Sequence, residues 1–311
     1  MNRKPVGSAA PLPTASRRAE ASAALLAHRG SDGRMPVHAY QKWQGPLWTL
    51  ICLAEIGHRK GDRSILPLRE QFREWLSAER HMQPPHSLLI PGQEDRFRRC
   101  ASQEGNAVWY SILLGMDDLR TRELTERLIA WQWPDGGWNC DKRPEARTSS
   151  VIETLIPLRA LWLASQHYTG ALGARAARAA ERAAEFFLAR SLFRRLRDGA
   201  QITKDFALIQ YPIQFYDILS ALQVMTEIGR IGDQRCGEAL GILRSKQLPD
   251  GGFPLEKPNA RTSASIITRG THADWGPSGK RRMNPLVTVT ALWILRAACG
   301  EGSARRTASP S

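Results

Sequence analysis

The sequence has no apolar run near the length that a membrane span needs, and this absence sets the first limit on its class. A transmembrane helix takes about 20 consecutive apolar residues, and no window of the 311 residues approaches that length. The basic first stretch also lacks the apolar core of a secretory signal. We therefore expect a cytoplasmic protein.

Paired cysteines are missing as well. The five cysteines are scattered without a C-x-x-C pair, so neither a disulfide framework nor a zinc-ribbon spacing is present. His272 has only Asp274 nearby in sequence, which is a weak ligand pair. The sequence therefore predicts reduced thiols, no metal and no cofactor.

The signal of a half-buried strand, an alternation of apolar and polar residues, is almost absent. Apolar residues recur instead at i, i+3 and i+4, which is the spacing of amphipathic helices. The sequence therefore predicts an all-α protein.

Acidic residues are too few to balance the basic ones. The chain has 44 Lys and Arg against 30 Asp and Glu, a formal net charge of +14, and such a field favours polyanionic partners. Seven arginines between Arg175 and Arg197 alternate with alanines at helical spacing. This pattern is typical of a solvated outer helix face or of peripheral contact with an anionic membrane. Nothing in it indicates a specific nucleic acid.

Two segments of the chain repeat one another. Trp131–Trp138 and Lys246–Phe253 each carry a Pro-Asp-Gly-Gly break, and each is followed by an Ala-Arg-Thr-Ser sequence, at 146–149 and 260–263. Pro stops a helix, Asp bonds the backbone that follows it, and Gly accepts the left-handed conformation that closes a helix end. Each repeat is therefore a helix, a turn, a loop and a second helix.

Weaker copies bring the number of helix pairs to five, at roughly 50–60 residues each. Similar pairs should pack with their second helices inside and their first helices outside. We expect one domain over 21–300, a disordered basic tail over 1–20 and a flexible tail over 301–311.

A second recurring element is a Gly that stops one helix a few residues before an Asp that caps the next. We expect such a cap, not a catalytic group, even at the adjacent pair Asp117-Asp118. The three copies are Gly57 with Asp62, Gly115 with Asp118, and Gly229 with Asp233.

These motifs resemble a known signature. Gln132-x-x-x-Gly136-Gly137-Trp138 resembles the Gln-Trp motif of squalene-hopene and oxidosqualene cyclases, and Gln247-x-x-x-Gly251-Gly252-Phe253 is similar to its variant in protein prenyltransferase beta subunits. With the weaker repeats, the resemblance covers most of the chain. It implies an α/α toroid of about five to six helical hairpins around an aromatic-lined apolar cavity. It also implies that the glutamine and the aromatic residue tie one repeat to the next.

The catalytic signatures of this terpenoid cyclase and prenyltransferase superfamily are absent from the sequence. There is no Asp-x-Asp-Asp cluster, and Asp117-Asp118 does not continue into Asp-Asp-x-x-Asp. Cys140-Asp141 has neither the order nor the spacing of the Asp-x-Cys zinc pair. Whether the chain is an enzyme stays open at this point.

The resemblance places the first turns of the inner helices at one mouth of the cavity. Glu104, Glu153 and Asp217 are the carboxylates at such positions, and we expect them to converge there. A desolvated carboxyl has a raised pKa and is able to transfer protons. The alternative is helix capping, since acidic residues are favoured in first turns and Ser150-x-x-Glu153 has capping-box spacing.

Aromatic residues recur near the same positions. Their π faces would suit a polyene substrate because they stabilise cationic intermediates, and the alternative is that they fill the core. The candidate substrate-binding residues are Trp43, Trp48, Trp109, Tyr211, Tyr216 and Trp275.

Three functions are compatible with these observations. The first is a protein that binds or processes an isoprenoid in the manner of the resembled superfamily. The second is a carbohydrate-processing α/α barrel, with Glu104 and either Asp217 or Glu153 as paired carboxylates. The third is a non-enzymatic scaffold that presents its loops to a protein partner.

Overall fold

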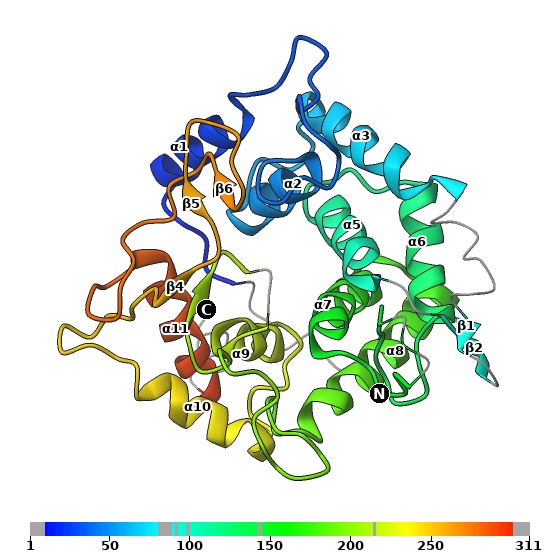
Figure 1. Ribbon diagram of the computed structural model, residues 1–311, viewed down its shortest axis with the longest axis vertical. Coiled ribbons are helices and arrows are strands. Elements are labelled where there is room, and N and C mark those ends of the chain that lie inside the picture. The colour runs from blue at the N-terminus through cyan, green and yellow to red at the C-terminus, as the bar shows by residue number, and fades with distance from the viewer. Residues whose placement is uncertain are drawn as a thin grey trace, which may run out of the picture. The chain divides into compact units, whose positions relative to one another are not determined.

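The structure is a computed structural model that describes residues 10–79, 89–90, 93–97, 100–141, 143, 145–213 and 216–300. Ten α-helices dominate these residues (Figure 1). They are α1 (Ala15–Leu26), α2 (Pro46–Glu55), α3 (Leu66–Leu76), α5 (Ala101–Leu113), α6 (Leu119–Ala130), α7 (Val151–His167), α8 (Gly170–Leu188), α9 (Ile218–Glu227), α10 (Gly237–Arg244) and α11 (Pro285–Ala298). None of these helices is both long and apolar enough to cross a membrane.

The strands among the described residues are short, and each pairs with one other strand. The antiparallel pair is β1 (Leu89–Ile90) with β2 (Gln93–Phe97). The parallel pairs are β3 (Gln210–Tyr211) with β4 (Lys257–Pro258), and β5 (Arg261–Thr262) with β6 (Gly270–Thr271). Helices thus carry the fold, and the predicted helical class is confirmed.

The helices follow the predicted order of five pairs: α1 with α2, α3 with α5, α6 with α7, α8 with α9, and α10 with α11. One boundary differs, because α1 begins at Ala15, inside the stretch that the sequence predicts as a disordered tail. The Thr14 hydroxyl caps this helix by accepting from the Arg17 amide, and its five alanines favour the helical conformation. The rest of the tail predictions, 1–9 and 301–311, lies outside the described residues.

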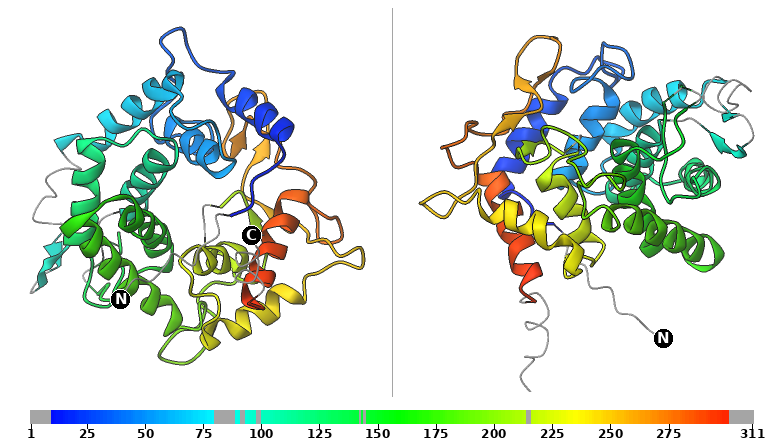
Figure 2. Two further views of the ribbon diagram at one scale, coloured as in Figure 1. Left: turned by 180° about the vertical axis from the view of Figure 1, so that it is seen from behind. Right: turned by 60° about the horizontal axis from the view of Figure 1, so that its bottom comes forward.

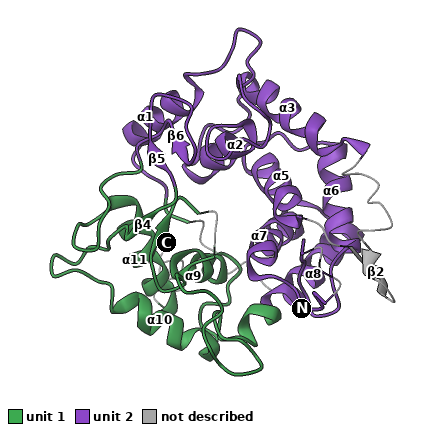
Figure 3. Ribbon diagram, in the orientation of Figure 1, with its two compact units in different colours: residues 1–11, 185–259, 275–311 green, residues 12–184, 260–274 purple. Residues whose placement is uncertain are grey.

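The chain divides into two compact units (Figure 3). Unit 2 contains residues 12–184 and 260–274, and unit 1 contains residues 1–11, 185–259 and 275–311. The prediction of one domain over 21–300 stays a prediction.

In unit 2 the second helices of the pairs are the buried ones. Nine of the ten residues of α2 and eleven of the thirteen residues of α5 are buried, whereas α3 buries only the stripe Leu68, Phe72, Arg73 and Leu76. The helix α5 packs against α2, α6 and α7, and Figure 2 shows this group from two further sides. A helix that is apolar on all sides is stable only in such a position.

Unit 1 is built around α9, which packs against α10 and α11. Nine of the ten α9 residues are buried. Its neighbour α10, the first helix of the last pair, buries only Ala239, Leu240 and Leu243. The second helix of that pair, α11, buries only Val287, Thr290, Ala291 and Ile294 of its fourteen residues. The burial of second helices seen in unit 2 therefore recurs at α9 but not at α11.

The three predicted Gly and Asp elements form as expected. The glycines Gly57, Gly115 and Gly229 have φ values of 71°, 67° and 71°, the left-handed conformation that ends a helix. The aspartates that follow cap the next element: Asp62 the 3₁₀ helix η1 (Arg63–Ile65), Asp118 the helix α6, and Asp233 the 3₁₀ helix η3 (Gln234–Cys236).

The first Pro-Asp-Gly-Gly turn joins α6 to the helices that follow it. The Gln132 Nε2 atom donates to the Gly136 carbonyl and to the Ala179 carbonyl of α8, both at 2.8 Å. The Trp138 indole is 1% exposed, and its Nε1 atom donates to the Leu128 carbonyl of α6 at 3.1 Å. The turn therefore connects two helix pairs, as the resemblance implies.

The glutamine side chain of the second Pro-Asp-Gly-Gly turn bonds only within that turn among the described residues. The Gln247 Nε2 atom donates to the Gly251 carbonyl at 2.9 Å, and no bond from it to another helix pair occurs in the described part of the chain. Phe253 is fully buried, and its amide donates to the Thr288 hydroxyl of α11 at 2.8 Å. Here the aromatic residue and its backbone make the connection to the next helix.

We predict that Trp138→Ala lowers the free energy of unfolding by about 3–5 kcal/mol, because it removes a fully buried indole and leaves a cavity. Chemical denaturation measures this. Leu119→Ala is the control: Leu119 is 75% exposed, and its truncation should change stability by less than about 0.5 kcal/mol. Equal unfolding free energies for wild type and Trp138→Ala would contradict the packing role.

The cap of α6 is also the partner of a buried cation. Arg73 is 2% exposed and donates to the Asp118 carboxylate at 2.5 Å and to the Thr121 hydroxyl at 2.6 Å. Burial alone would raise the pKa of Asp118, but the hydrogen bond and charge of Arg73 outweigh it and lower this pKa to about 2. A charge held in this way is stabilising only while the carboxylate is ionised.

We predict that Asp118→Ala costs about 3 kcal/mol at pH 7, because it leaves Arg73 buried without its partner and removes a helix cap. The folded pKa lies below the ordinary 3.8, so the difference from wild type is complete above about pH 4 and fades as the pH falls through about 2. Unfolding curves at several pH values test this. Asp205→Ala, which breaks the exposed pair with Lys257, is the control and should cost less than about 1 kcal/mol.

Candidate functional site

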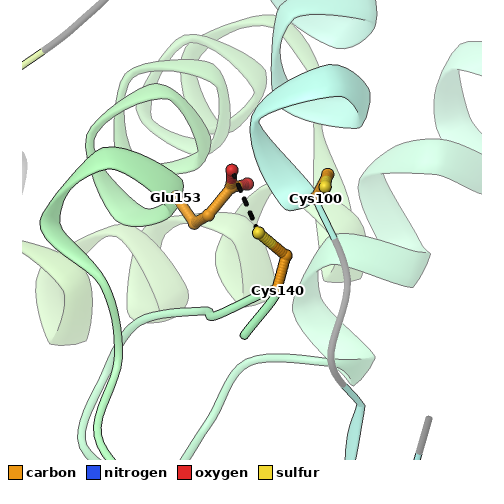
Figure 4. A group of neighbouring side chains, drawn as sticks. All are labelled: Cys100, Cys140 and Glu153. Carbon is orange, nitrogen blue, oxygen red and sulfur yellow. Dashed lines mark hydrogen bonds between the residues drawn. The ribbon is translucent and has the colours of Figure 1, made fainter. Parts of the chain in front are cut away.

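Three side chains with metal-binding or acid–base chemistry meet in unit 2. Cys100, Cys140 and Glu153 each have a ligand-type atom, and these atoms all lie within 4.8 Å of one another (Figure 4). We call them the thiol–carboxyl cluster. The Cys140 Sγ atom lies 3.7 Å from Glu153 Oε1 and donates to it. The cluster combines two sulfur atoms with one carboxylate.

The cluster forms where two buried helices begin. Cys100 is the residue before α5, Cys140 lies in the loop before α7, and Glu153 is in the first turn of α7. The Ser102 amide, one of the free amides of the first α5 turn, donates to Glu153 Oε2 at 3.0 Å. This bond satisfies a helix-end donor and turns the other carboxylate oxygen, Oε1, toward Cys140.

The capping-box alternative for Glu153 does not form. Ser150, at the start of α7, makes no side-chain cap bond. The Glu153 carboxylate bonds to the neighbouring helix α5 instead of to its own. The first-turn position of this glutamate is therefore used to join α7 to α5.

Burial controls the protonation of the cluster. Desolvation raises the pKa of Glu153, the hydrogen bonds from Ser102 and Cys140 lower it, and the nearby Glu104 carboxylate raises it again. The pKa of the Cys140 thiol is raised by its hydrogen bond with Cys100, by burial and by the charge of Glu153. The pKa values of both Glu153 and Cys140 are thus raised in this group.

Aromatic and amide groups surround the cluster. The pKa of Tyr40 is raised by burial, lowered by a hydrogen bond with Gln103, and raised by the charges of Cys100, Glu153 and Cys140. The Tyr40 ring also lies 6.2 Å from that of Trp48, between centroids. The cluster therefore has a polar interior and an aromatic margin.

Glu104 is the second predicted carboxylate in unit 2, and it has a different partner. It is 2% exposed and pairs with Arg127 of α6 at 2.8 Å. Its charge affects the pKa of Glu153, so the structure brings these two glutamates into one neighbourhood. The ion pair, however, gives Glu104 a role in joining α5 to α6.

Asp217, the third predicted carboxylate, is the N-cap of α9 in unit 1. Its Oδ1 atom accepts from the Ser220 amide at 3.0 Å, and its Oδ2 atom accepts from the Gln210 amide of β3 at 2.8 Å. It is 2% exposed. Burial raises its pKa to about 6, although the bonds from Ser220 and Gln210 act in the opposite direction. The capping alternative is thus formed at Asp217, and its convergence with Glu104 and Glu153 stays a prediction.

The six predicted substrate-binding aromatic residues are buried side chains. In unit 2 the Trp109 face is covered by the Arg159 guanidinium at 4.1 Å, and in unit 1 Tyr216 stacks on Phe187 and donates to the Leu192 carbonyl. None is more than 5% exposed: Trp43 1%, Trp48 1%, Trp109 4%, Tyr211 5%, Tyr216 3% and Trp275 4%. They pack as the core-filling alternative expects.

His272 and Asp274 do not form a ligand pair. The His272 Nδ1 atom bonds to the Ser263 carbonyl at 2.9 Å, and its ring stacks on His28 at 3.8 Å. Asp274 pairs with Arg17 at 3.4 Å. The two side chains therefore belong to the contacts that join residues 260–274 to α1 and to His28, which follows it.

Sequence reasoning missed the thiol–carboxyl cluster as a group. Such reasoning looked for ligands that are close together along the chain. Cys100, however, precedes α5, and Cys140 follows α6, so the two cysteines are far apart in sequence. A partial signal existed, because Cys140 and Glu153 both lie near the start of the same predicted inner helix. The prediction of no metal was thus made without this convergence.

Comparisons with known proteins give the site no name. No family model matches the chain, and no curated protein matches it. The chemistry of the site is therefore argued from its residues.

We predict that Asp217→Ala destabilises unit 1 by about 2 kcal/mol or more in mild acid, because it removes a helix cap and leaves the buried Gln210 amide without an acceptor. The folded pKa of about 6 exceeds the ordinary 3.8, so this contribution is complete below about pH 4 and is lost as the pH rises through about 6. Chemical denaturation of the variant and the wild type at pH 4 and pH 7 measures the stability difference in acid and its loss at neutral pH.

Asp233→Ala is the matched control, since Asp233 also caps a helix. The hydrogen bond from Arg235 is the main cause that lowers its pKa, to about 2. Its contribution should therefore be present above about pH 4 and fade in acid, opposite to Asp217. An Asp217→Ala variant as stable as wild type at pH 4 would exclude the capping role.

Proposed function

We propose that the helix pairs of this chain close into an α/α toroid and that the chain binds an isoprenoid beside the thiol–carboxyl cluster of unit 2. The observation that carries the proposal is the position of the cluster. It is a small polar group at the first turns of two buried helices, with the ring of Tyr40 beside it and that of Trp48 next to Tyr40. Such a combination suits a ligand with a long apolar chain and one polar or reactive end.

The helix pairs support this proposal through their turns. The Gln132 and Trp138 bonds connect successive pairs in the way that the resembled superfamily uses its Gln-Trp motif. The buried helices α2, α5 and α7 also pack next to one another in chain order. This is the arrangement from which an inner layer of second helices is built.

The margin of the cluster supports an apolar ligand with a polar end. Trp48 is 1% exposed, and its Nε1 donor has no hydrogen-bond partner in the described part of the chain. A buried donor without an acceptor lowers the stability of the folded state. A polar ligand group that reached it would supply the acceptor and gain binding energy from it.

A carbohydrate ligand fits the same residues less well. Glycosidases use two carboxyl groups in complementary protonation states, roughly 5–9.5 Å apart. Glu104 is held by Arg127, and the indole face of Trp109 is covered by Arg159. An isoprenoid requires neither a second free carboxylate nor an open indole platform.

The proposed setting is the cytoplasm, where the thiols of Cys100 and Cys140 stay reduced. The exposed face of α8 carries Arg175, Arg178 and Arg182. These arginines suit a peripheral contact with an anionic membrane, the phase in which isoprenoids dissolve. The proposal includes no specific nucleic acid.

Thermal and chemical unfolding in the presence of candidate ligands tests the function. Farnesyl diphosphate or squalene should stabilise the wild-type protein, by about 2.7 kcal/mol at a ligand concentration of 100 Kd, whereas a cello-oligosaccharide should not. Cys140→Trp adds bulk inside the cluster and should abolish the stabilisation. Cys299→Ser, at the end of α11, should retain it.

Two results would contradict the proposal. Stabilisation by the oligosaccharide alone would favour the carbohydrate alternative. If none of the three ligands stabilised the protein, the non-enzymatic scaffold would remain as the alternative function.

A further inference from the structure

We propose that Cys100, Cys140 and Glu153 bind one zinc ion through their two sulfur atoms and one carboxylate oxygen, with the fourth position open to a water or a substrate atom. This site goes beyond isoprenoid binding, because it requires no organic ligand. It also reverses the sequence-based expectation of no metal.

The distances between the ligand atoms fit a tetrahedral site. With Zn–S bonds of about 2.3 Å and Zn–O bonds of about 2.1 Å, neighbouring ligand atoms lie about 3.6–3.8 Å apart. The observed distance from Cys140 Sγ to Glu153 Oε1 is 3.7 Å. All three ligand atoms are within 4.8 Å of one another, so an ion needs a contraction of at most about 1 Å, which side-chain rotation supplies.

The ligand types select zinc among the common divalent ions. Magnesium and calcium prefer all-oxygen sites, and iron–sulfur clusters use four thiolates or replace some with histidine. Two thiolates and a carboxylate are ordinary zinc ligands, and three protein ligands with one open position is the pattern of zinc sites that bind a water or substrate.

A backbone amide already holds the Glu153 carboxylate in place. The Ser102 amide occupies Glu153 Oε2, so Oε1 is the oxygen that faces the thiols. A metal-binding carboxylate is usually oriented by a hydrogen bond of this kind. Cys100 adds an electrostatic contribution, because it lies at the N-terminus of the 13-residue helix α5, where the helix dipole favours a thiolate.

Zinc binding exchanges protons on the ligands for the metal ion. When Zn²⁺ binds, each thiol releases one proton and Glu153 releases one if it is protonated, and no electron is transferred. Zinc binds the thiolate and carboxylate forms of these ligands, so protons compete with the ion. Zinc affinity should therefore rise with pH. Cys100 is accessible to solvent and provides the entry for the ion.

Metal analysis of the full chain, purified under reducing conditions and without any isoprenoid, tests the site. We expect one zinc per chain after dialysis. We also expect Co²⁺ substitution to give the intense visible bands of a tetrahedral site and a near-ultraviolet sulfur-to-cobalt charge-transfer band. Zinc should protect Cys100 and Cys140 from alkylation in a peptide mass map.

Variants assign the ligands. Loss of second-shell partners alone weakens metal binding by roughly 10–100-fold, so Cys140→Ser and Glu153→Gln should weaken zinc binding by at least about 100-fold. Cys299→Ser is the matched control and should bind zinc as wild type does. Circular dichroism checks that each variant is folded, and the wild-type cobalt spectrum does not depend on any variant.

The proposal is overturned by a metal content near zero after zinc addition, by retained zinc in the Cys100→Ser and Cys140→Ser double variant, or by a Cys100–Cys140 disulfide that persists in reductant. These outcomes are independent of the isoprenoid test. A chain that binds squalene but no zinc would refute only the metal site, and one that binds zinc but no isoprenoid would refute only the proposed ligand.

Discussion

The ends of buried helices impose the constraint on which the rest of this structure depends. The first amides and last carbonyls of a helix have no partner within it, and the helices α2, α5 and α9 are buried along almost their whole length. Each end must then find a bond from a side chain or a neighbouring turn. Asp118, Asp217 and Asn284 supply such bonds at the starts of α6, α9 and α11.

Close backbone approach follows from the same constraint. Gly136 has a φ of 96°, and a Cβ atom there would meet the Arg182 carbonyl oxygen of α8. The neighbouring Gly137 would place a Cβ atom against Ser149 and Thr154. The Pro-Asp-Gly-Gly turn is thus more than a break between helices, because its two glycines let α8 and the start of α7 lie directly against it. The thiol–carboxyl cluster lies in the segments that this packing holds.

Sequence reasoning succeeded where the determinants are local. The Asp caps and Gly stops depend on a few consecutive residues, and the helix pairs depend on periodicity, so both could be predicted. The roles of Asp217 and Glu153 could not be separated in this way, since both are acidic residues near helix starts. One accepts the amides of its own helix and of β3, whereas the other turns to α5. The meeting of Cys100 with Cys140 depends on how α5 and α7 pack, a property that no spacing in the sequence contains.

The order of the chain in unit 2 has a consequence for synthesis. Gln44 bonds through its amide to the Ser265 carbonyl and the Ile267 amide, and 221 residues separate Gln44 from Ser265. A ribosome that adds about 5–20 residues per second needs roughly 10–40 s to cover that interval. During this time α1 and α2 are outside the ribosome without the segment that covers them, while the whole of residues 185–259 emerges. Unit 2 therefore receives its last segment, residues 260–274, only after residues 185–259 of unit 1 have been made.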